Sequence, residues 1–394
     1  MQRRGVLATL GALATGGCLR LQEADESVNS STAASQQAGD EGGDTTNGGD
    51  GTTSQVSLSE QWQSSMFAAN VWTADGTFFF NGSDGAAAAT PADGLVWSAG
   101  ASSAGSMTIG ADAFATDGSH AVIGFSGGSG ADASAHFHGY ETGTGQELWQ
   151  VDAPADGNHT VAEASAVVDG LAVVGAADHG SGSDQTPVVY GVDIQTGERV
   201  WETTVPDLPN GFIADIIPHD GDLYVSFAWK GVRVVDPGTG SVSGTRDSIE
   251  TGVWGSRLHE GVLYAPWDGA VVAYEFDGSS RWTTDEGGDV RCRPAVDDEL
   301  VVVGTKAGFV HAFATETGEK RWDARIDSQV SAIDMTSSHV WVAGEQGTVT
   351  AYTRSDGTLA HESFHDLNGG GLGVVNDTVF IGGNQATAFR IDDA

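Results

Sequence analysis

One short segment recurs along this chain and constrains its fold more than any other feature. Residues 190–201 read Tyr-Gly-Val-Asp-Ile-Gln-Thr-Gly-Glu-Arg-Val-Trp, residues 311–322 read His-Ala-Phe-Ala-Thr-Glu-Thr-Gly-Glu-Lys-Arg-Trp, and residues 139–149 keep the same turn and the final Trp. Apolar residues alternate on both sides of each turn, and glycine supplies the positive φ that a tight hairpin needs. Each copy therefore predicts strand, turn, strand, and the repetition predicts a repeat architecture.

A second hairpin precedes each copy, so that one unit holds four short strands. Residues 162–168 with 171–175 are one example, and residues 290–296 with 300–304 are another. Four antiparallel strands per unit are typical of a propeller blade. The pattern indicates seven such units and no helix beyond an N-terminal export segment.

The two ends of the repeat region supply one more blade. Strands expected at 379–382 and 386–391 lack an outer partner, whereas residues 58–62 look like an outer strand with no strands before it. Joining them completes an eighth blade and leaves no open sheet edge. We therefore expect an all-β, eight-bladed propeller over residues 58–394, closed by pairing of the N- and C-terminal strands, with a seven-bladed ring as the alternative.

Most units end in a tryptophan. Such a ring removes roughly 150–250 Å² from water when it is buried, so one ring per blade is expected to pack between neighbouring blades rather than to bind a ligand. Two units depart from this pattern, because Gly244 and His361 stand in the Trp position. The expected docking residues are Trp62, Trp97, Trp149, Trp201, Trp282 and Trp322.

Residues 192–201 resemble the Ala-x-Asp-x-x-Thr-Gly-x-x-x-Trp motif of PQQ-type repeat propellers. That family includes quinoprotein dehydrogenases, which hold pyrroloquinoline quinone (PQQ) and calcium over the channel, and assembly-factor lipoproteins similar to BamB, which present loops to protein partners. The enzymes place two adjacent cysteines against the quinone, whereas the only cysteines in this chain are Cys18 and Cys292. The resemblance therefore favours the non-enzymatic class, with no cofactor expected. The alternative is a PQQ- and calcium-dependent dehydrogenase with a divergent site at Trp254.

The N-terminus resembles a twin-arginine lipoprotein signal. Arg3 and Arg4 precede a short apolar stretch that ends in Thr-Gly-Gly before Cys18. We expect a signal peptide at 1–17 and a lipid on Cys18 that anchors the exported protein to the outer face of the cytoplasmic membrane. Residues 18–57 lack aromatic residues and predict a disordered tether. Cys292 is then the remaining thiol, which we expect to be a small buried hydrophobic residue.

The charge is strongly acidic, with 17 Lys and Arg against 54 Asp and Glu, for a net charge of −37. Self-repulsion of this size is relieved when concentrated salt shortens the Debye length. The composition resembles that of salt-adapted archaeal proteins, and the scattered carboxylates are expected to form a solvated surface. We expect a monomer without a nucleic-acid partner, because no basic patch is present to pair with phosphates.

Two places are candidates for binding. Enlarged loops near 126–135 and 177–186 lie beside His136 and His138, whose imidazoles share one side of a strand and form a weak zinc or copper candidate without a third ligand. The channel mouth is the other place. Arginine forks there suit an anionic ligand, although neutralisation of inner carboxylates such as Asp215 and Asp289 is the favoured explanation. The mouth residues are Glu163, Asp215, Trp254, Arg257, Arg291 and Arg293.

The sequence thus favours a lipid-anchored propeller that acts as a non-enzymatic binding or assembly scaffold. Its partner would be a protein, a glycan or a small anionic ligand.

Overall fold

The structure is a computed structural model. It describes residues 13–15, 18–20, 56–100, 113–126, 135–153, 161–177, 186–204, 208, 211–285, 288–367 and 371–393. Arg3 and Arg4, most of the expected tether and most of both enlarged loops lie outside these ranges, and only the backbone is described at Cys18. Near the N-terminus, β1 (Leu13–Thr15) pairs with β2 (Cys18–Arg20).

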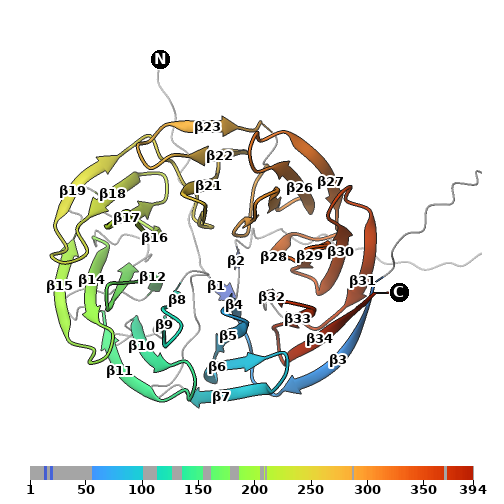
Figure 1. The fold of residues 1–394 in the computed structure, drawn as a ribbon, viewed down its shortest axis with the longest axis horizontal. Coiled ribbons are helices and arrows are strands. Elements are labelled where there is room, and N and C mark those ends of the chain that lie inside the picture. The colour runs from blue at the N-terminus through green and yellow to red at the C-terminus, as the bar shows by residue number, and fades with distance from the viewer. Residues whose placement is uncertain are drawn as a thin grey trace, which may run out of the picture.

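Eight four-stranded antiparallel sheets stand around a central channel, as Figure 1 shows. The strands of each blade follow one another from the channel outward. The first four blades are β4 (Asn70–Ala74), β5 (Thr77–Gly82), β6 (Gly85–Thr90), β7 (Gly94–Gly100); β8 (Phe114–Thr116), β9 (His120–Phe125), β10 (His136–Glu141), β11 (Glu147–Asp152); β12 (Val161–Val168), β13 (Leu171–Ala177), β14 (Val188–Asp193), β15 (Arg199–Thr204); and β16 (Ile213–His219), β17 (Asp222–Phe227), β18 (Gly231–Val235), β19 (Val242–Arg246).

The remaining blades continue around the ring. They are β20 (Arg257–His259), β21 (Val262–Trp267), β22 (Ala270–Tyr274), β23 (Ser280–Thr283); β24 (Ala295–Val296), β25 (Leu300–Gly304), β26 (Phe309–Ala314), β27 (Lys320–Arg325); β28 (Val330–Met335), β29 (His339–Gly344), β30 (Thr348–Thr353), β31 (Leu359–Phe364); and β32 (Leu372–Val375), β33 (Thr378–Ile381), β34 (Ala386–Asp393), β3 (Val56–Ser64).

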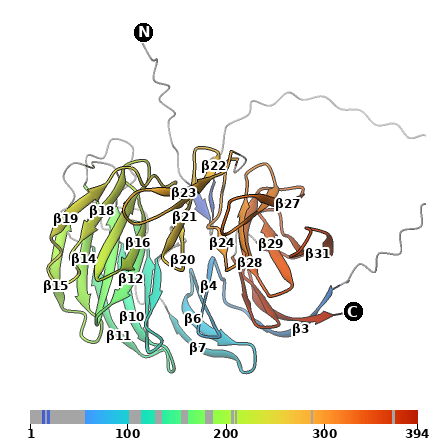
Figure 2. The same cartoon turned by 45° about the horizontal axis from the view of Figure 1, so that its top comes forward.

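The eighth blade joins two distant parts of the sequence, which confirms the eight-bladed ring and excludes the seven-bladed alternative. β3 pairs antiparallel with β34, from Val56 opposite Asp393 to Ser64 opposite Ala386. Figure 2 shows β3 and the C-terminal end side by side at the same edge of the molecule. The sequence predicted only two C-terminal strands in this blade, and the structure adds β32 as the inner one. That strand was missed because it is four residues long and contains Gly373.

The inner strand of blade 6 is much shorter than predicted. Residues 290–296 were expected to be extended, but only Ala295–Val296 forms a strand, and Val290 contributes an isolated bridge to Thr305. Pro294 explains the difference, because proline has no N–H to donate to the ladder and restricts the residue before it. Residues 291–294 are therefore irregular backbone at the channel wall. None of the described segments is a helix that could cross a membrane.

Trp62 of blade 8 packs its ring against Gly94 of blade 1, but its buried Nε1 has no hydrogen-bond partner among the described residues. Five other tryptophans of the outer strands fasten their blade to the next. The indole Nε1 donates to a backbone carbonyl in the hairpin turn of the following blade, and the ring lies against the glycine of that turn. At Gly197, where φ is 74°, an added Cβ would lie 2.5 Å from the Trp149 side chain, so only glycine admits the ring. The bonds run from Trp97 to Thr142 (2.7 Å), Trp149 to Ile194 (2.7 Å), Trp201 to Pro237 (2.7 Å), Trp282 to Thr315 (2.9 Å) and Trp322 to Arg354 (2.8 Å).

Two interfaces use another donor for the same purpose. Gly244 pairs with Val234 at the register where Trp201 pairs with Gly191. Two residues further on, Arg246 Nε donates to the Phe276 carbonyl of blade 5 at 3.1 Å.

At the closing blade the donor is a histidine. His361 Nδ1 lies 2.9 Å from the carbonyl oxygen of Val56, the first residue of β3. A carbonyl only accepts, so this ring nitrogen carries the hydrogen. The sequence identified the missing tryptophans but not their replacements.

Candidate functional site

The central channel contains a cavity of about 420 Å³ near blades 5 to 8 and 1 to 2. Trp254, Arg257 and Arg293 line one part of it, and Trp72 with Phe114 lines another. The Trp72 and Phe114 rings are stacked, with centroids 5.1 Å apart. The cavity therefore combines guanidinium groups with an aromatic and aliphatic wall.

A buried carboxylate at the channel mouth connects residues of blades 4, 5 and 6. Asp215, at the beginning of β16, accepts a hydrogen bond from the backbone N–H of Ser256 at 2.6 Å. It also accepts from the Ser256 hydroxyl and from the Arg293 guanidinium. One carboxylate of blade 4 thus joins residues that precede the inner strands of blades 5 and 6. Arg293 therefore neutralises an inner carboxylate, which is one of the two explanations that the sequence left open for the mouth arginines.

Arg291 and Trp254 form a second contact at the mouth. The Arg291 guanidinium lies 5.6 Å from the Trp254 ring centroid, within the range of a cation–π interaction. The same guanidinium donates to Asp289 at 2.6 Å. Arg291 is thus paired with the second carboxylate that the sequence suggested for neutralisation.

Arg257 faces a different carboxylate. Burial raises the pKa of Asp334, and the charge of Arg257 partly opposes that rise, as do hydrogen bonds from two backbone groups. The backbone N–H groups of Val374 and Met335 donate to Asp334, each at 2.8 Å. Asp334 was not among the residues predicted from the sequence, because an Asp within an apolar strand carries no motif.

Glu163 serves blade packing rather than the channel cavity. The ladder between β12 and β13 shifts register between Ala162 and Ala164, so Glu163 sits on a bulge. Bulges redirect a side chain, and this one lets Glu163 accept a hydrogen bond from the backbone N–H of Ile213 in the next blade at 2.7 Å. Of the six predicted mouth residues, the structure therefore places Trp254, Arg257 and Arg293 on the cavity wall, and Asp215 and Arg291 against them.

The histidine pair lies on the outer half of blade 2. His138 is buried and its Nδ1 lies 3.2 Å from Glu147, while His136 Nδ1 lies 3.6 Å from Asp152. Burial lowers the pKa of both imidazoles, so both favour the neutral form. Within the part of the chain that the structure describes, neither histidine belongs to a group of three closely spaced ligand atoms.

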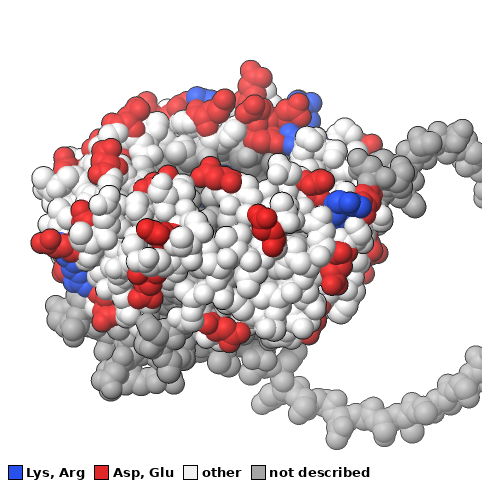
Figure 3. All heavy atoms as spheres, turned by 60° about the horizontal axis from the view of Figure 1, so that its bottom comes forward, with Lys and Arg blue, Asp and Glu red and all other residues white. Residues whose placement is uncertain are grey.

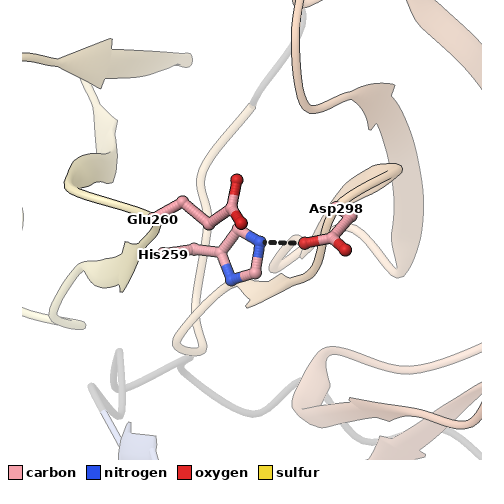
Figure 4. Close-up of side chains that lie close together, drawn as sticks. All are labelled: His259, Glu260 and Asp298. Atoms are coloured by element: carbon pink, nitrogen blue, oxygen red, sulfur yellow. Dashed lines mark hydrogen bonds and ion pairs between the residues drawn. The ribbon is translucent and has the colours of Figure 1, made fainter.

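Such a group does occur at the hairpin turns of blades 5 and 6. His259, Glu260 and Asp298 offer ligand atoms within 4.8 Å of one another, as Figure 4 shows. His259 Nε2 is bonded to Asp298 at 2.8 Å, and both carboxylates are exposed. A hydrogen bond between neighbouring turns accounts for this arrangement without a metal ion.

Cys292 lies beside the channel, and its thiol is in an environment that lowers its reactivity. Its side chain is buried, and burial raises its thiol pKa to about 12. The thiolate is the reactive form, so this environment suppresses nucleophilic chemistry and suits a small apolar residue.

The donor set does not fit a calcium-bound quinone. Calcium requires six to eight oxygen ligands, with carboxylates prominent among them. The carboxylates at the channel are already bonded: Asp215 to Ser256 and Arg293, Asp334 to two backbone N–H groups, and Asp297 to Arg354. Arg257 and Arg293 add positive charge where a divalent cation would have to bind. These residues therefore support no chemical step through calcium or PQQ.

Comparison with known proteins agrees with the repeat and the ring. A stretch of 183 residues is 24% identical to the outer membrane protein assembly factor BamB of Yersinia pestis, covering 45% of this chain and 39% of that protein. BamB from Moraxella catarrhalis superimposes with a TM-score of 0.60 at 17% identity, over 85% of this chain and 100% of the other. A quinohemoprotein alcohol dehydrogenase from Pseudomonas putida gives 0.63 at 14% identity, over 86% and 76%. At such identities the two structures show the fold alone.

The repeated turns and the tryptophan-fastened ring define a β-propeller of the PQQ-type repeat class. Within that class, the chain belongs to the family of the outer membrane protein assembly factor BamB, whose model matches residues 55–260 and 267–393.

Proposed function

We propose that this protein is a non-enzymatic scaffold, exported and anchored by a lipid on Cys18 at the outer face of the cytoplasmic membrane. Its channel mouth would bind an anionic group on a protein, a glycan or a small molecule. The observation that carries this proposal is the convergence of Arg257, Arg293 and Trp254 on one cavity. The family match supports a scaffold role, because relatives in this family are named as assembly factors.

The charge distribution supports selectivity at this mouth. The chain has a net charge of −37, and Figure 3 shows Asp and Glu scattered over one face with few Lys or Arg among them. An anion approaching most of the surface is therefore repelled. Arg257, together with the Asp215-bound Arg293, brings guanidinium charge into the channel at a place where cations are otherwise scarce, and an anion there would accept hydrogen bonds from it. The same surface is consistent with a protein adapted to concentrated salt.

A direct assay separates the scaffold from the quinoprotein alternative. The full chain would be titrated calorimetrically with PQQ and calcium in molar salt, alongside a dye-linked dehydrogenase assay on alcohols and sugars. We expect no binding heat and no turnover, because the channel carboxylates are already bonded. Tight quinone binding with turnover would overturn the scaffold and establish a dehydrogenase with a divergent site.

A second experiment tests the mouth. A photo-crosslinking residue replacing Trp254 in membranes should capture a partner, whereas the same residue at Leu95, an exposed position on β7, should not. Arg257→Gln with Arg293→Gln should reduce capture at position 254 at least fivefold. Equal capture from both positions would contradict a specific mouth. In the same membranes, Cys18→Ser should release the protein into the medium, and retention would contradict the lipid anchor.

A further inference from the structure

A surface groove lies away from the channel, at the interface between blades 4 and 5. A groove of about 480 Å³ opens there. Its lining includes Glu250 and Ser248 of the connection between the blades, Trp267 at the end of β21, Asp268 of the turn that follows, and Val272 of β22. It shares no lining residue with the channel cavity.

Small side chains stand at two positions of this interface where other blades carry rings. On the blade 4 side, Gly244 occupies the position of the docking tryptophan. On the blade 5 side, Val272 immediately precedes Ala273, the residue paired with Trp282. The corresponding positions in blades 2, 3 and 6, which precede the partners of Trp149, Trp201 and Trp322, hold rings: His138, Tyr190 and His311.

In blade 3, large side chains cover the sheet surface that corresponds to the groove of blade 5. The Arg199 guanidinium lies 4.5 Å from the Tyr190 ring centroid, and it also bonds Glu202 at 3.3 Å. A guanidinium thus rests between an aromatic face and a carboxylate. The strand register of blade 5 places three other residues at these positions: Ser280 for Arg199, Val272 for Tyr190 and Thr283 for Glu202. The strands of blade 5 therefore supply no guanidinium, no aromatic ring and no carboxylate at these three positions.

The loops around the groove restore two of those three groups. Trp267 supplies an aromatic ring, and Glu250 and Asp268 supply exposed carboxylates. No Lys or Arg is among the lining residues. Tyr274 forms part of the wall, and its hydroxyl is hydrogen-bonded to the backbone of Glu250, which fixes that segment. The lining itself lacks a cation, and the neighbouring Arg246, which lies beside Gly278, is already bonded to the Phe276 carbonyl.

We propose that this groove binds an arginine side chain of a partner protein, which takes the place that Arg199 holds in blade 3. The guanidinium would lie against Trp267 and donate hydrogen bonds to Glu250 and Asp268. Arginine suits this better than lysine, because its planar group both stacks on a ring and donates to two carboxylates. The negative surface of the chain would steer such a partner toward the groove.

The test uses acetyl-arginine-amide as the probe and acetyl-citrulline-amide, its uncharged analogue, as the control ligand. Binding to the full chain would be followed by ligand-observed NMR at low and at molar salt. We expect the arginine compound to bind, the citrulline compound to bind at least about tenfold more weakly, and affinity to fall as salt rises. Equal binding of the two compounds, or no binding of either at low salt, would overturn the proposal.

Variants locate the binding. Val272→Tyr should abolish binding by filling the groove as Tyr190 fills blade 3, with folding checked by the melting temperature. Glu250→Gln and Asp268→Asn, which remove no packing, should each weaken binding severalfold. Glu362→Gln is the control. Glu362 is an exposed carboxylate of blade 7, opposite Thr350, at the register that Glu202 has in blade 3, and it lies away from the groove. Loss of binding in the control, or unchanged binding in both carboxylate variants, would refute the groove as the site.

Discussion

The interfaces on the two sides of blade 4 solve the same problem in different ways. Between blades 3 and 4, the buried Trp201 ring fills the space and its Nε1 donates to the Pro237 carbonyl. Between blades 4 and 5, Arg246 donates to the Phe276 carbonyl at the same place in the turn. The hydrogen bond is retained, but the apolar volume of the indole is not.

This difference separates two roles that the tryptophan combines. The donor role satisfies a turn carbonyl and fixes the angle between blades, and several side chains can perform it. The volume role excludes water, and only a large ring performs it. Where the roles come apart, the ring of blades stays closed but a groove remains on its outer part.

The largest effect is expected from truncating the two donors. Trp201→Ala should lower the free energy of unfolding by about 3–5 kcal/mol, because it removes a buried ring and leaves a cavity. Arg246→Ala should cost only about 1 kcal/mol, the net worth of a hydrogen bond at a partly exposed site. Denaturant unfolding of both variants measures the difference. Equal losses would mean that the hydrogen bond, rather than the volume, holds blades together.

A smaller effect is expected at the turn glycines that face these donors. Gly240→Ala should destabilise by about 2 kcal/mol, because φ is 71° and the new Cβ would lie 2.5 Å from the Trp201 ring. Gly278→Ala has a similar backbone strain, but its nearest neighbour is the Ser248 hydroxyl, which can rotate away. Thermal unfolding should therefore rank Gly240→Ala as the more damaging change, and the reverse order would contradict the role of ring contact.

The closing interface has a pH dependence of its own, which comes from a partly buried histidine. Ser363 bonds both His361 and His365, each at 2.9 Å. Burial and then the nearby His361 lower the pKa of His365 below 6.5. The folded state therefore binds fewer protons than the unfolded state, and stability present above pH 6.5 is lost as the pH falls.

Acidification from pH 7.5 to 5.5 should accordingly lower the melting temperature, and His365→Gln should reduce that drop by about 1–2 °C. The Trp201→Ala variant should keep the full drop. An unchanged pH profile in His365→Gln would assign the acid sensitivity elsewhere.

In the Cys18→Ser chain, where Cys292 is the one cysteine, no effect is expected from a thiol reagent on the folded protein. Cys292 is buried with its pKa raised to about 12, so labelling should wait for opening of blade 6. Trp322→Ala should speed labelling, because Trp322 packs in the same hydrophobic cluster as Cys292. Arg246→Ala, at a different interface, is the control. Rapid labelling of the Cys18→Ser chain without further changes would contradict the buried thiol.

The sequence predicted the ring well because local rules set it. Alternating strands, Thr-Gly turns and terminal tryptophans recur, and the register of Trp62 on β3 followed from them. The site was only partly predictable. Arg257 and Arg293 were placed near the axis by strand order, but Asp334 and the Arg246 donor depend on side-chain reach between blades, which no spacing encodes. The groove beside Val272 lies at the interface where Gly244 takes the place of a docking tryptophan, and small residues carry no signal by themselves.

Pairing of Val56 with Asp393 has a mechanical consequence. The first residue of β3 and the last residue of β34 lie opposite each other at one end of blade 8. A pull on the segment before Val56 therefore loads the hydrogen bonds between these two strands one at a time, beginning with the pair at Val56. Antiparallel bonds lie perpendicular to the strands, and this geometry peels rather than shears them. His361, bonded to the Val56 carbonyl, is then the first contact with the neighbouring blade to feel the load. If the protein carries the proposed lipid anchor, tension from it would open the propeller at the histidine-fastened interface while the tryptophan-fastened ones remained closed.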